Sequence, residues 1–499
     1  MTAQLIQVPD SVQNPDSNKT KQLLAKVPTG LLIGSDFVKG ENEDFDVLDP
    51  ANGDLLTKVS NAGVKDLAKA LDIAVVAQEK WAKTAPRVRG EVLRKTFELM
   101  IQQADDIAFL MSLENGKTLV DAKAEVLYAA EFFRWFSEEA VRIDGSLRHA
   151  PSGANKILTY KQPIGIAFLI TPWNFPAAMA TRKIGPALAA GCTVILKPAS
   201  ETPLTAIWIV DILHRVGVPK GVVNYLLPSK TGPMISRMLH DPRVRNLSFT
   251  GSTEVGRVLL KEAADNVVRC SMELGGNAPF VVLDDANTDE AVAAVMVAKM
   301  RNGGAACTAA NRIYVAKSIA DEFTKKLTKA MADLKMAPGL ETGAQLGASV
   351  SLKERNKIAE IVDAAVSSGG EITTGGKIPT GDGAFYPATV LKVNKENEIL
   401  RKEIFGPVAP VVTFDSDEEA LKLANDSEFG LISYVFSGDL KRAIKFAEGL
   451  ESGMVAINRG VISDPAAPFG GVKQSGLGRE GGFDGIHEFL ETKYIGVEI

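Results

Sequence analysis

The chain has 499 residues, of which 45% are hydrophobic and 23% charged, a composition typical of a globular protein with two or more domains. Lys and Arg number 56 against 61 Asp and Glu, for a net charge of -5. A balance this mild gives no reason to expect nucleic acid or a membrane surface as partner. The three cysteines, Cys192, Cys270 and Cys307, are too few for a disulfide framework and indicate a reducing compartment.

The first thirty residues show no targeting signal. They lack the apolar core of a signal peptide and the arginine-rich, acid-poor character of a transit peptide. No apolar run approaches the length needed to span a bilayer, and the strongest, residues 165–170, has the length of a strand. We therefore expect a cytoplasmic protein.

Helical stretches are predicted after a polar N-terminal arm, because Ala- and Leu-rich sequence repeats with helical periodicity. They cover residues 64–82, 89–113 and 119–142. Asn115 and Gly116 are expected to stop the second stretch. Two strands, 156–162 and 165–170, are predicted to follow as a hairpin.

Strands and helices then alternate in two blocks, which predicts an α/β fold with parallel, doubly wound sheets. The first block has predicted strands at 193–196, 222–227 and 246–250 and helices at 203–216, 232–239 and 254–264. The second has predicted strands at 280–283 and 313–315 and helices at 289–300, 320–334, 352–368, 417–425 and 440–450. Two such blocks imply a cleft between them, where ligands commonly bind. The tail, 489–499, is predicted to be an edge strand.

Cys307 is the first candidate for chemistry. It follows a helix and the small residues Gly303, Gly304, Ala305 and Ala306, and such residues let backbone approach a ligand closely. Taken alone, a free cysteine is more often a small buried hydrophobe, and Cys192 and Cys270 fit that interpretation. A thiol in an open loop could instead act as a nucleophile.

Two polar residues at predicted strand ends are the next candidates. Glu273 ends a strand and meets two glycines. It could be a solvated surface group, or a general base toward water if it lies in a cleft. Asn174 stands in a turn made rigid by Pro172 and Pro176, where its amide could hold an oxyanion. The alternative is an ordinary loop.

Three further motifs suggest a nucleotide site. Lys197 stands at the end of a buried strand, where ligands bind in open α/β sheets. The segment Gly251–Gly256 is a strand, a glycine turn and a helix start, whose backbone N–H groups favour phosphate. Glu403 and Phe405 pair a carboxylate with an aromatic ring in a loop. Taken alone, Lys197 could be a solvated lysine just past a strand end. The other two motifs could each be a plain turn.

The order and spacing of these motifs along the chain are more specific than any one motif. With residues 468–476 closing the series, they resemble the aldehyde dehydrogenase superfamily motif by motif, from about Asp46 to the C-terminus. The resemblance implies an aldehyde dehydrogenase fold: an atypical Rossmann-like cofactor domain, an α/β catalytic domain and a small β oligomerisation element. The implied boundaries are 1–27 for the N-terminal arm, 28–145 and 164–275 for the cofactor domain, 276–475 for the catalytic domain, and 146–163 and 476–499 for the oligomerisation element and tail.

The resemblance also implies roles. Cys307 would attack the aldehyde, Asn174 would hold the oxyanion, and Glu273 would activate water to hydrolyse the thioester. No metal ligand is implied. The cofactor contacts implied by the resemblance are Trp173, Asn174, Lys197, Ser200, Gly251, Ser252, Leu274, Glu403 and Phe405. We expect a homodimer or homotetramer.

Cofactor choice depends on the residue three positions after Lys197. A glutamate there, as in many NAD-preferring relatives, bonds the ribose 2′-hydroxyl and repels a 2′-phosphate. This chain has Ser200, which predicts a preference for NADP over NAD.

The aldehyde is predicted to carry a carboxylate. The segments around Arg182 and Arg301 resemble succinate-semialdehyde dehydrogenases, in which two arginines grip the substrate carboxylate, and Ser463 matches the serine that joins them. The arginine fork suits a carboxylate because it can bond both oxygens. The alternative for either arginine is a salt bridge to a neighbouring acid.

Other functions stay open at this point. The chain could oxidise another aldehyde, such as glutarate semialdehyde, it could be a non-catalytic relative, or it could use coenzyme A in place of water. The chain also departs from the family pattern at Ala305, where the superfamily usually has Gln or Glu. We expect this change to widen the space beside the thiol.

Overall fold

The structure is a computed structural model that describes residues 17–498. The first sixteen residues of the predicted N-terminal arm lie outside the described part, as does Ile499 of the predicted C-terminal strand. Within the described part the chain begins with α1 (Ser17–Leu24), a helix that the sequence did not predict.

The first sheet has eight strands, and its central part is parallel, as the alternating pattern predicted. In spatial order the strands are β2 (Asp36–Val38), β1 (Leu31–Ile33), β9 (Val223–Tyr225), β8 (Thr193–Lys197), β7 (Ile166–Ile170), β10 (Val244–Thr250), β11 (Arg269–Glu273) and β21 (Gly476–Leu477). The outer strands β1, β2 and β21 pair antiparallel. Strands β7 and β8 are buried along their whole length, which is typical of a sheet covered by helices on both faces.

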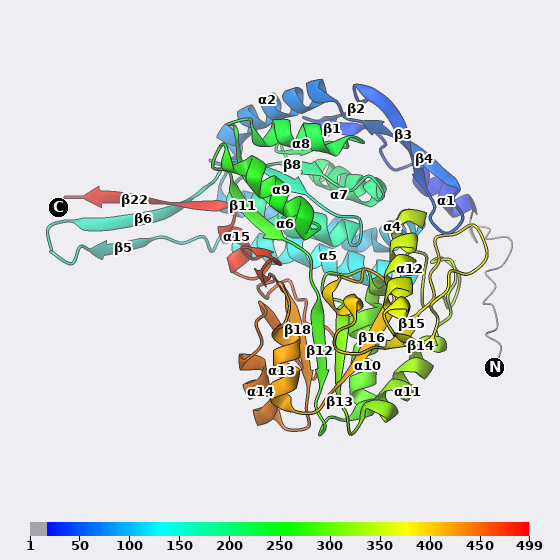
Figure 1. The fold of residues 1–499 in the computed structure, drawn as a ribbon. Coiled ribbons are helices and arrows are strands. Elements are labelled where there is room, and N and C mark those ends of the chain that lie inside the picture. Colours follow the sequence, from blue (N-terminus) through cyan, green and yellow to red (C-terminus); the bar gives the residue numbers. More distant parts are fainter. Residues whose placement is uncertain (1–16, 499) are drawn as a thin grey trace.

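Helices cover this sheet (Figure 1). They are α2 (Val64–Trp81), α3 (Pro86–Gln102), α4 (Ala104–Asn115), α5 (Leu119–Glu139), α6 (Pro176–Ala190), α7 (Pro203–Arg215), α8 (Thr231–Leu239) and α9 (Thr253–Ala264). The prediction of one helix over 89–113 was wrong, because the chain breaks at Gln103 into α3 and α4. Gly116, in the left-handed region at φ 87°, ends α4 as predicted.

The second sheet has seven strands, parallel except for β14. In spatial order they are β14 (Glu371–Thr374), β15 (Thr389–Lys392), β16 (Val408–Phe414), β13 (Ala310–Ala316), β12 (Ala278–Val282), β18 (Ile432–Phe436) and β19 (Met454–Ile457). Its helices are α10 (Thr288–Met300), α11 (Ala320–Ala332), α12 (Leu352–Ser367), α13 (Asp417–Asn425) and α14 (Leu440–Glu448). Alternate residues of one strand point to opposite faces, so Phe280 and Val281 lie in two different hydrophobic clusters.

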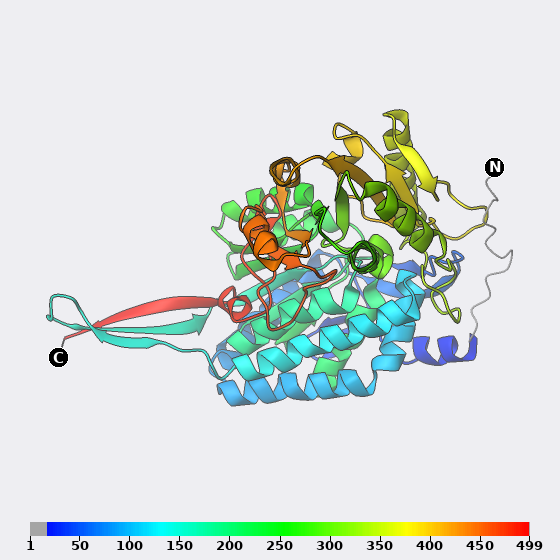
Figure 2. The same cartoon turned by 90° about the horizontal axis from the view of Figure 1, so that it is seen from below.

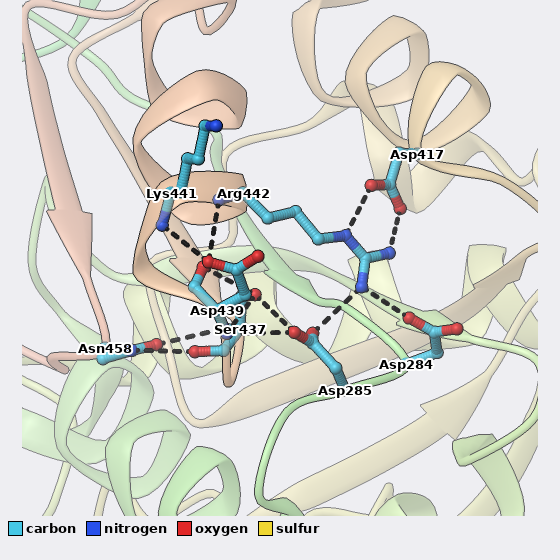
Figure 3. Close-up of polar contacts among 8 residues, drawn as sticks. All are labelled: Asp284, Asp285, Asp417, Ser437, Asp439, Lys441, Arg442 and Asn458. Carbon is cyan, nitrogen blue, oxygen red and sulfur yellow. Dashed lines mark hydrogen bonds and ion pairs between the residues drawn. The ribbon is translucent and has the colours of Figure 1, made fainter.

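A polar cluster connects the helices and loops at the carboxyl-end edge of the second sheet (Figure 3). Arg442, from α14, donates two hydrogen bonds to Asp417 at 2.6 and 2.7 Å. The same guanidinium lies 2.7 Å from Asp284 and 3.1 Å from Asp285, which follow β12. Ser437, which follows β18, donates to Asp285 at 2.8 Å. One arginine thus joins α13, α14 and the loop after β12.

A three-stranded sheet projects from the body as an arm (Figure 1 and Figure 2). It is made of β5 (Ser146–His149), β6 (Lys156–Pro163) and β22 (Leu490–Val497), with β6 in the middle. The predicted hairpin of 156–162 with 165–170 was therefore wrong, because β6 pairs in the arm and β7 in the first sheet. The C-terminal segment is an edge strand as predicted.

Smaller elements complete the fold. Strands β3 (Asn42–Leu48) and β4 (Leu55–Asn61) pair with each other, as do β17 (Phe429–Gly430) and β20 (Val472–Lys473). Short helical turns are η1 (Arg301–Gly304), η2 (Glu398–Arg401) and α15 (Asp484–His487). Over residues 17–498, no helix combines the length and the apolar character that a membrane crossing requires.

Candidate active site

The predicted site residues gather where the carboxyl ends of the first sheet face the amino ends of the second. The parallel register sets Ile170 beside Lys197 and Thr250 beside Glu273. The turn with Asn174 therefore starts level with the glycine turn after β10. Cys307 precedes β13 of the second sheet, so the thiol reaches this region from the opposite side.

A left-handed turn carries Cys307. After α10 the chain passes through η1, where Asn302, Gly303 and Gly304 have φ values of 56°, 59° and 78°. A side chain at Gly304 would lie 2.2 Å from the carbonyl oxygen of Gly406. Glycine is therefore required at this position, both by the backbone angle and by the close approach.

Cys307 lies at the junction of two cavities. The wide cavity is lined by Pro172, Trp173, Asn174, Met179, Thr250, Gly251, Ser252, Leu274, Gly275, Cys307, Glu354, Lys357, Glu403 and Phe405. The narrow cavity is lined by Tyr128, Phe175, Met179, Arg182, Arg301, Cys307, Thr308, Ser463 and Phe469. The half-buried thiol is thus accessible from two sides, and two reactants could meet at it.

Most predicted cofactor residues line the wide cavity; Lys197 and Ser200 do not. Lys197 ends β8 and is 8% exposed. Burial lowers the pKa of its ammonium to about 8, and the neighbouring Glu201 opposes that shift. Ser200 is half-buried, three residues further on.

The wide cavity combines features that suit a dinucleotide. Ser252 caps the N-terminus of α9, where the helix favours an anion such as phosphate. Trp173 and Phe405 meet edge to face, with ring centroids 5.3 Å apart. Glu403 accepts a hydrogen bond from the main chain of Gly276 at 2.9 Å. Burial raises the pKa of the Glu403 carboxyl to about 7, and the hydrogen bond from Gly276 opposes the shift.

Asn174 is held from several directions. Its main-chain oxygen accepts hydrogen bonds from Lys117 at 2.6 Å and from Asn302 at 2.8 Å. Its amide nitrogen donates to the carbonyl of Ala305 at 3.1 Å. An amide nitrogen carries two hydrogens, so one fixes the rotamer and the second is available to a ligand beside Cys307.

Glu273 is buried between charges. One of its oxygens has no hydrogen-bond partner among the described residues, and the side chain is 4% exposed with its neighbours Gly470 and Arg479 close by. Burial and the negative charge of Glu480 raise the pKa of Glu273 well above its usual value, while Arg182 and Lys183 oppose the shift. A carboxylate with a raised pKa is a stronger base and can take a proton from water more readily.

A buried ion-pair network lies behind Glu273. Lys183 contacts the Glu480 carboxylate and donates to Ser248 at 2.9 Å. The other Glu480 oxygen lies 3.3 Å from Arg182 Nε. The structure thus gives Arg182 the acidic neighbour that the sequence left open as an alternative, and it also places Arg182 in the narrow cavity.

The predicted substrate residues Arg182, Arg301 and Ser463 line the narrow cavity together. The guanidinium of Arg182 lies 4.2 Å from the centroid of the Phe469 ring, and that of Arg301 lies 5.1 Å from the Phe175 ring. Aromatic walls leave cations poorly hydrated and therefore ready to bind an anion.

Sequence reasoning missed several lining residues. Tyr128 belongs to an aromatic cluster in α5 whose spacing predicts a helix core. Phe175 precedes α6 and Met179 lies in its first turn, and this helix was not predicted. Glu354 and Lys357 lie 2.6 Å apart on α12, where the sequence predicted only a helix. None of these residues has a local pattern that marks a site.

Ala305 lines a third cavity, together with Asn302, Leu346, Tyr386 and Phe405 among others. Neither the wide nor the narrow cavity includes Ala305. This third cavity shares Trp173 and Phe405 with the wide cavity. Hydrogen bonds from Asn174 and Asn302 to the carbonyl of Ala305 hold the loop.

Comparison with known proteins adds independent evidence. The family model described as "Aldehyde dehydrogenase family" matches residues 37–495. The succinate-semialdehyde dehydrogenase of Paenarthrobacter nicotinovorans is 51% identical over 444 residues, which cover 89% of this chain and 99% of that protein. The glutarate-semialdehyde dehydrogenase of Pseudomonas putida is 45% identical over 469 residues, covering 93% and 97%. An NADP(+) succinate-semialdehyde dehydrogenase of Escherichia coli is 44% identical over 466 residues, covering 93% and 96%.

The same similarity holds in three dimensions. The crystal structure of a succinate-semialdehyde dehydrogenase from Burkholderia pseudomallei superposes with a TM-score of 0.93 at 41% identity, covering 98% of this chain and 100% of that one. The fold of this chain is therefore shared over nearly its full length.

Proposed function

The chain belongs to the aldehyde dehydrogenase family, and on that premise we propose that it oxidises succinate semialdehyde to succinate with NADP as hydride acceptor. One observation carries the choice of substrate: Arg182, Arg301 and Ser463 line the same narrow cavity as Cys307. An aldehyde whose carbonyl meets the thiol would thus place a carboxylate on the far side among two cations and a hydroxyl. The similarity to named succinate-semialdehyde dehydrogenases at 51% and 44% identity supports the same substrate.

In the first half of the reaction, the Cys307 sulfur attacks the carbonyl carbon and forms a thiohemiacetal. The negative oxygen is held by the Asn174 amide and by the main-chain N–H of Cys307. Donors that are fixed before the reaction stabilise such an oxyanion strongly. The bound dinucleotide supplies the hydride acceptor, and Trp173, Gly251, Ser252, Leu274, Glu403 and Phe405 would hold it, with Lys197 and Ser200 at its adenosine ribose.

In the second half, the acyl group is a thioester on Cys307. Glu273 takes a proton from water, the water oxygen attacks the thioester carbon, and the carbon–sulfur bond breaks. Glu273 returns its proton to the leaving sulfur, which regenerates the thiol, and succinate leaves. Burial and the charge of Glu480 raise the pKa of Glu273, which makes its carboxylate a stronger base toward water.

A comparison of substrates tests the proposed substrate. We expect kcat/KM for succinate semialdehyde to exceed that for butanal, an uncharged aldehyde of equal chain length, and Arg182→Ala and Arg301→Ala to remove that preference. If both variants keep the wild-type ratio, the carboxylate assignment is wrong. Glutarate semialdehyde belongs in the same series, because the Pseudomonas putida relative is named for it and one methylene changes selectivity by only about 1–3 kcal/mol.

The preference for NADP rests on Ser200. A serine hydroxyl can donate to a 2′-phosphate and adds no negative charge, whereas a glutamate would repel it. The Escherichia coli relative carries NADP(+) in its name, which supports the same choice. Measured kcat/KM values for both cofactors decide the point, and a strong preference for NAD would contradict it.

We also propose that the protein is cytoplasmic and that it forms a homodimer or homotetramer through the arm. The domain boundaries are proposed as the family resemblance implies them. Leu147 of β5 and Tyr494 of β22 are 65% and 59% exposed on the arm, and within residues 17–498 both outer strands have an unpaired edge. Light scattering after size exclusion measures the assembly. A monomer at micromolar concentration would contradict the proposal.

A further inference from the structure

Tyr128 occupies a distinctive position in the narrow cavity. It projects from α5, and its hydroxyl oxygen accepts a hydrogen bond from Arg182 Nη2 at 3.1 Å. Its ring packs edge to face on Phe132, with centroids 5.0 Å apart. The ring is therefore fixed by the core, and the hydroxyl is aimed at the cavity that Arg182 and Arg301 line.

The hydrogen of this hydroxyl has no acceptor among residues 17–498. A tyrosine hydroxyl accepts and donates at once, and the acceptor side is taken by Arg182. Burial raises the pKa of Tyr128, with Arg182 and Arg301 opposing the shift, so the hydroxyl keeps its hydrogen at neutral pH. An unused donor thus points into a cavity that otherwise offers cations and the Ser463 hydroxyl.

Arg182 cannot grip a carboxylate with its whole guanidinium. Nη2 is bonded to Tyr128, and Nε faces the Glu480 carboxylate at 3.3 Å. One hydrogen of Nη2 and those of Nη1 are left, and the one hydrogen bond of Nη1 among the described residues is to the Met179 sulfur at 3.8 Å. Because Glu480 also offsets part of the charge of Arg182, an incoming carboxylate needs further donors.

We infer that Tyr128 is a specificity-determining residue: its hydroxyl orients Arg182 by accepting from Nη2 and donates its own hydrogen to the far carboxylate of the semialdehyde. The inference rests on the proposed function. In this arrangement Tyr128, the remaining N–H groups of Arg182, Arg301 and Ser463 share the two carboxylate oxygens. An uncharged aldehyde gains nothing from the hydroxyl.

The test is Tyr128→Phe in the full-length protein, assayed with succinate semialdehyde and butanal at saturating NADP. The phenyl ring keeps the contact with Phe132, and thermal unfolding verifies that the variant is folded. We expect KM for succinate semialdehyde to rise about 10-fold or more, the range for losing a hydrogen bond to a charged group, while kcat/KM for butanal changes less than about 2-fold.

Tyr314→Phe is the matched control. Tyr314 is also buried, and its hydroxyl lies 3.4 Å from an arginine nitrogen, Arg312 Nη1. It stands on β13 and lines neither the wide nor the narrow cavity. We expect this variant to leave the ratio of the two substrates unchanged.

The outcomes separate the inference from the proposed function. If wild type prefers succinate semialdehyde and Tyr128→Phe keeps that preference, the role of Tyr128 is wrong and the proposed substrate stands. An equal loss for both substrates also overturns the inference, because it shows only a structural role. If wild type itself does not discriminate between the two aldehydes, the proposed substrate fails.

Discussion

The ammonium nitrogen of Lys117 lies 2.6 Å from the main-chain oxygen of Asn174. The same ammonium pairs with Glu125 at 2.5 Å. Glu125 in turn accepts hydrogen bonds from the main chain of Ala177 and Ala178, in the first turn of α6. A buried ion pair thus fixes both ends of the turn that presents the Asn174 amide, at a site where small displacements are costly.

The double variant Lys117→Met/Glu125→Gln should therefore reduce kcat by about 10- to 100-fold, because the oxyanion donor loses its alignment. Changing both partners avoids a single unpaired buried charge, which alone would cost about 3–5 kcal/mol. The rate of Cys307 alkylation serves as an internal control, since it does not need the oxyanion donor. Unchanged kcat in a folded double variant would contradict this role.

Cys307 should react slowly at neutral pH in the absence of ligands. Burial raises the pKa of its thiol to about 12; Arg182 opposes the shift, and Glu273 adds to it. Because the thiolate is the reactive form, the rate of alkylation by iodoacetamide should rise about tenfold per pH unit up to at least about pH 9. Arg182→Met removes the stabilising cation and should slow the reaction further. A plateau near pH 7 in the free protein would show that the thiol is already ionised.

Arg442 should matter for stability and not for catalysis. It joins Asp417, Asp284 and Asp285 (Figure 3) and lines neither cavity at Cys307. Arg442→Gln should lower the free energy of unfolding by about 1–3 kcal/mol, as expected for a partly buried network, and leave kcat unchanged.

The matched control for that variant is Arg94→Gln. Arg94 also bonds two acids, Glu91 and Glu98, but its side chain is 44% exposed. Its loss should cost less than about 1 kcal/mol. Thermal unfolding of both variants measures the difference, and equal midpoints would mean that the Arg442 cluster adds nothing.

The sequence predicted the two parallel blocks because helix and strand periodicities are local signals. It misplaced β6, because one of its two partners, β22, is more than 300 residues away, and the other, β5, is a short exposed strand without a buried pattern. The narrow cavity was not predicted from local patterns for the same reason, because residues far apart in the sequence line it. Tyr128 stands four residues before Phe132, a spacing that reads as helix core. Only the packing of α5 against α6 shows that its hydroxyl meets Arg182. The three substrate residues were found through the family resemblance and not from local pattern.

Ser200→Glu should reverse the cofactor preference. A carboxylate beside the 2′-phosphate adds like-charge repulsion, which costs several kcal/mol at a desolvated contact, so the ratio of kcat/KM for NADP to that for NAD should fall about 100-fold or more. In Ser200→Gln the new side chain has nearly the size of glutamate but no charge, so this variant should change the ratio far less. Equal behaviour of the two variants would mean that the charge at this position does not select the cofactor.

Glu273→Gln should separate the two halves of the reaction. The thioester still forms, so mixing with aldehyde and NADP should give a burst of about one NADPH per active site, followed by turnover slowed about 100-fold or more through loss of the base.

The pH dependence follows from the raised pKa of Glu273, caused mainly by burial and then by Glu480. The protonated carboxyl cannot act as base, so deacylation in wild type should accelerate as the pH rises through that pKa. Glu480→Gln removes the negative neighbour, lowers the pKa of Glu273 and should shift the profile to lower pH. If Glu273→Gln turns over like wild type, or if the wild-type deacylation rate falls as the pH rises, Glu273 is not the base.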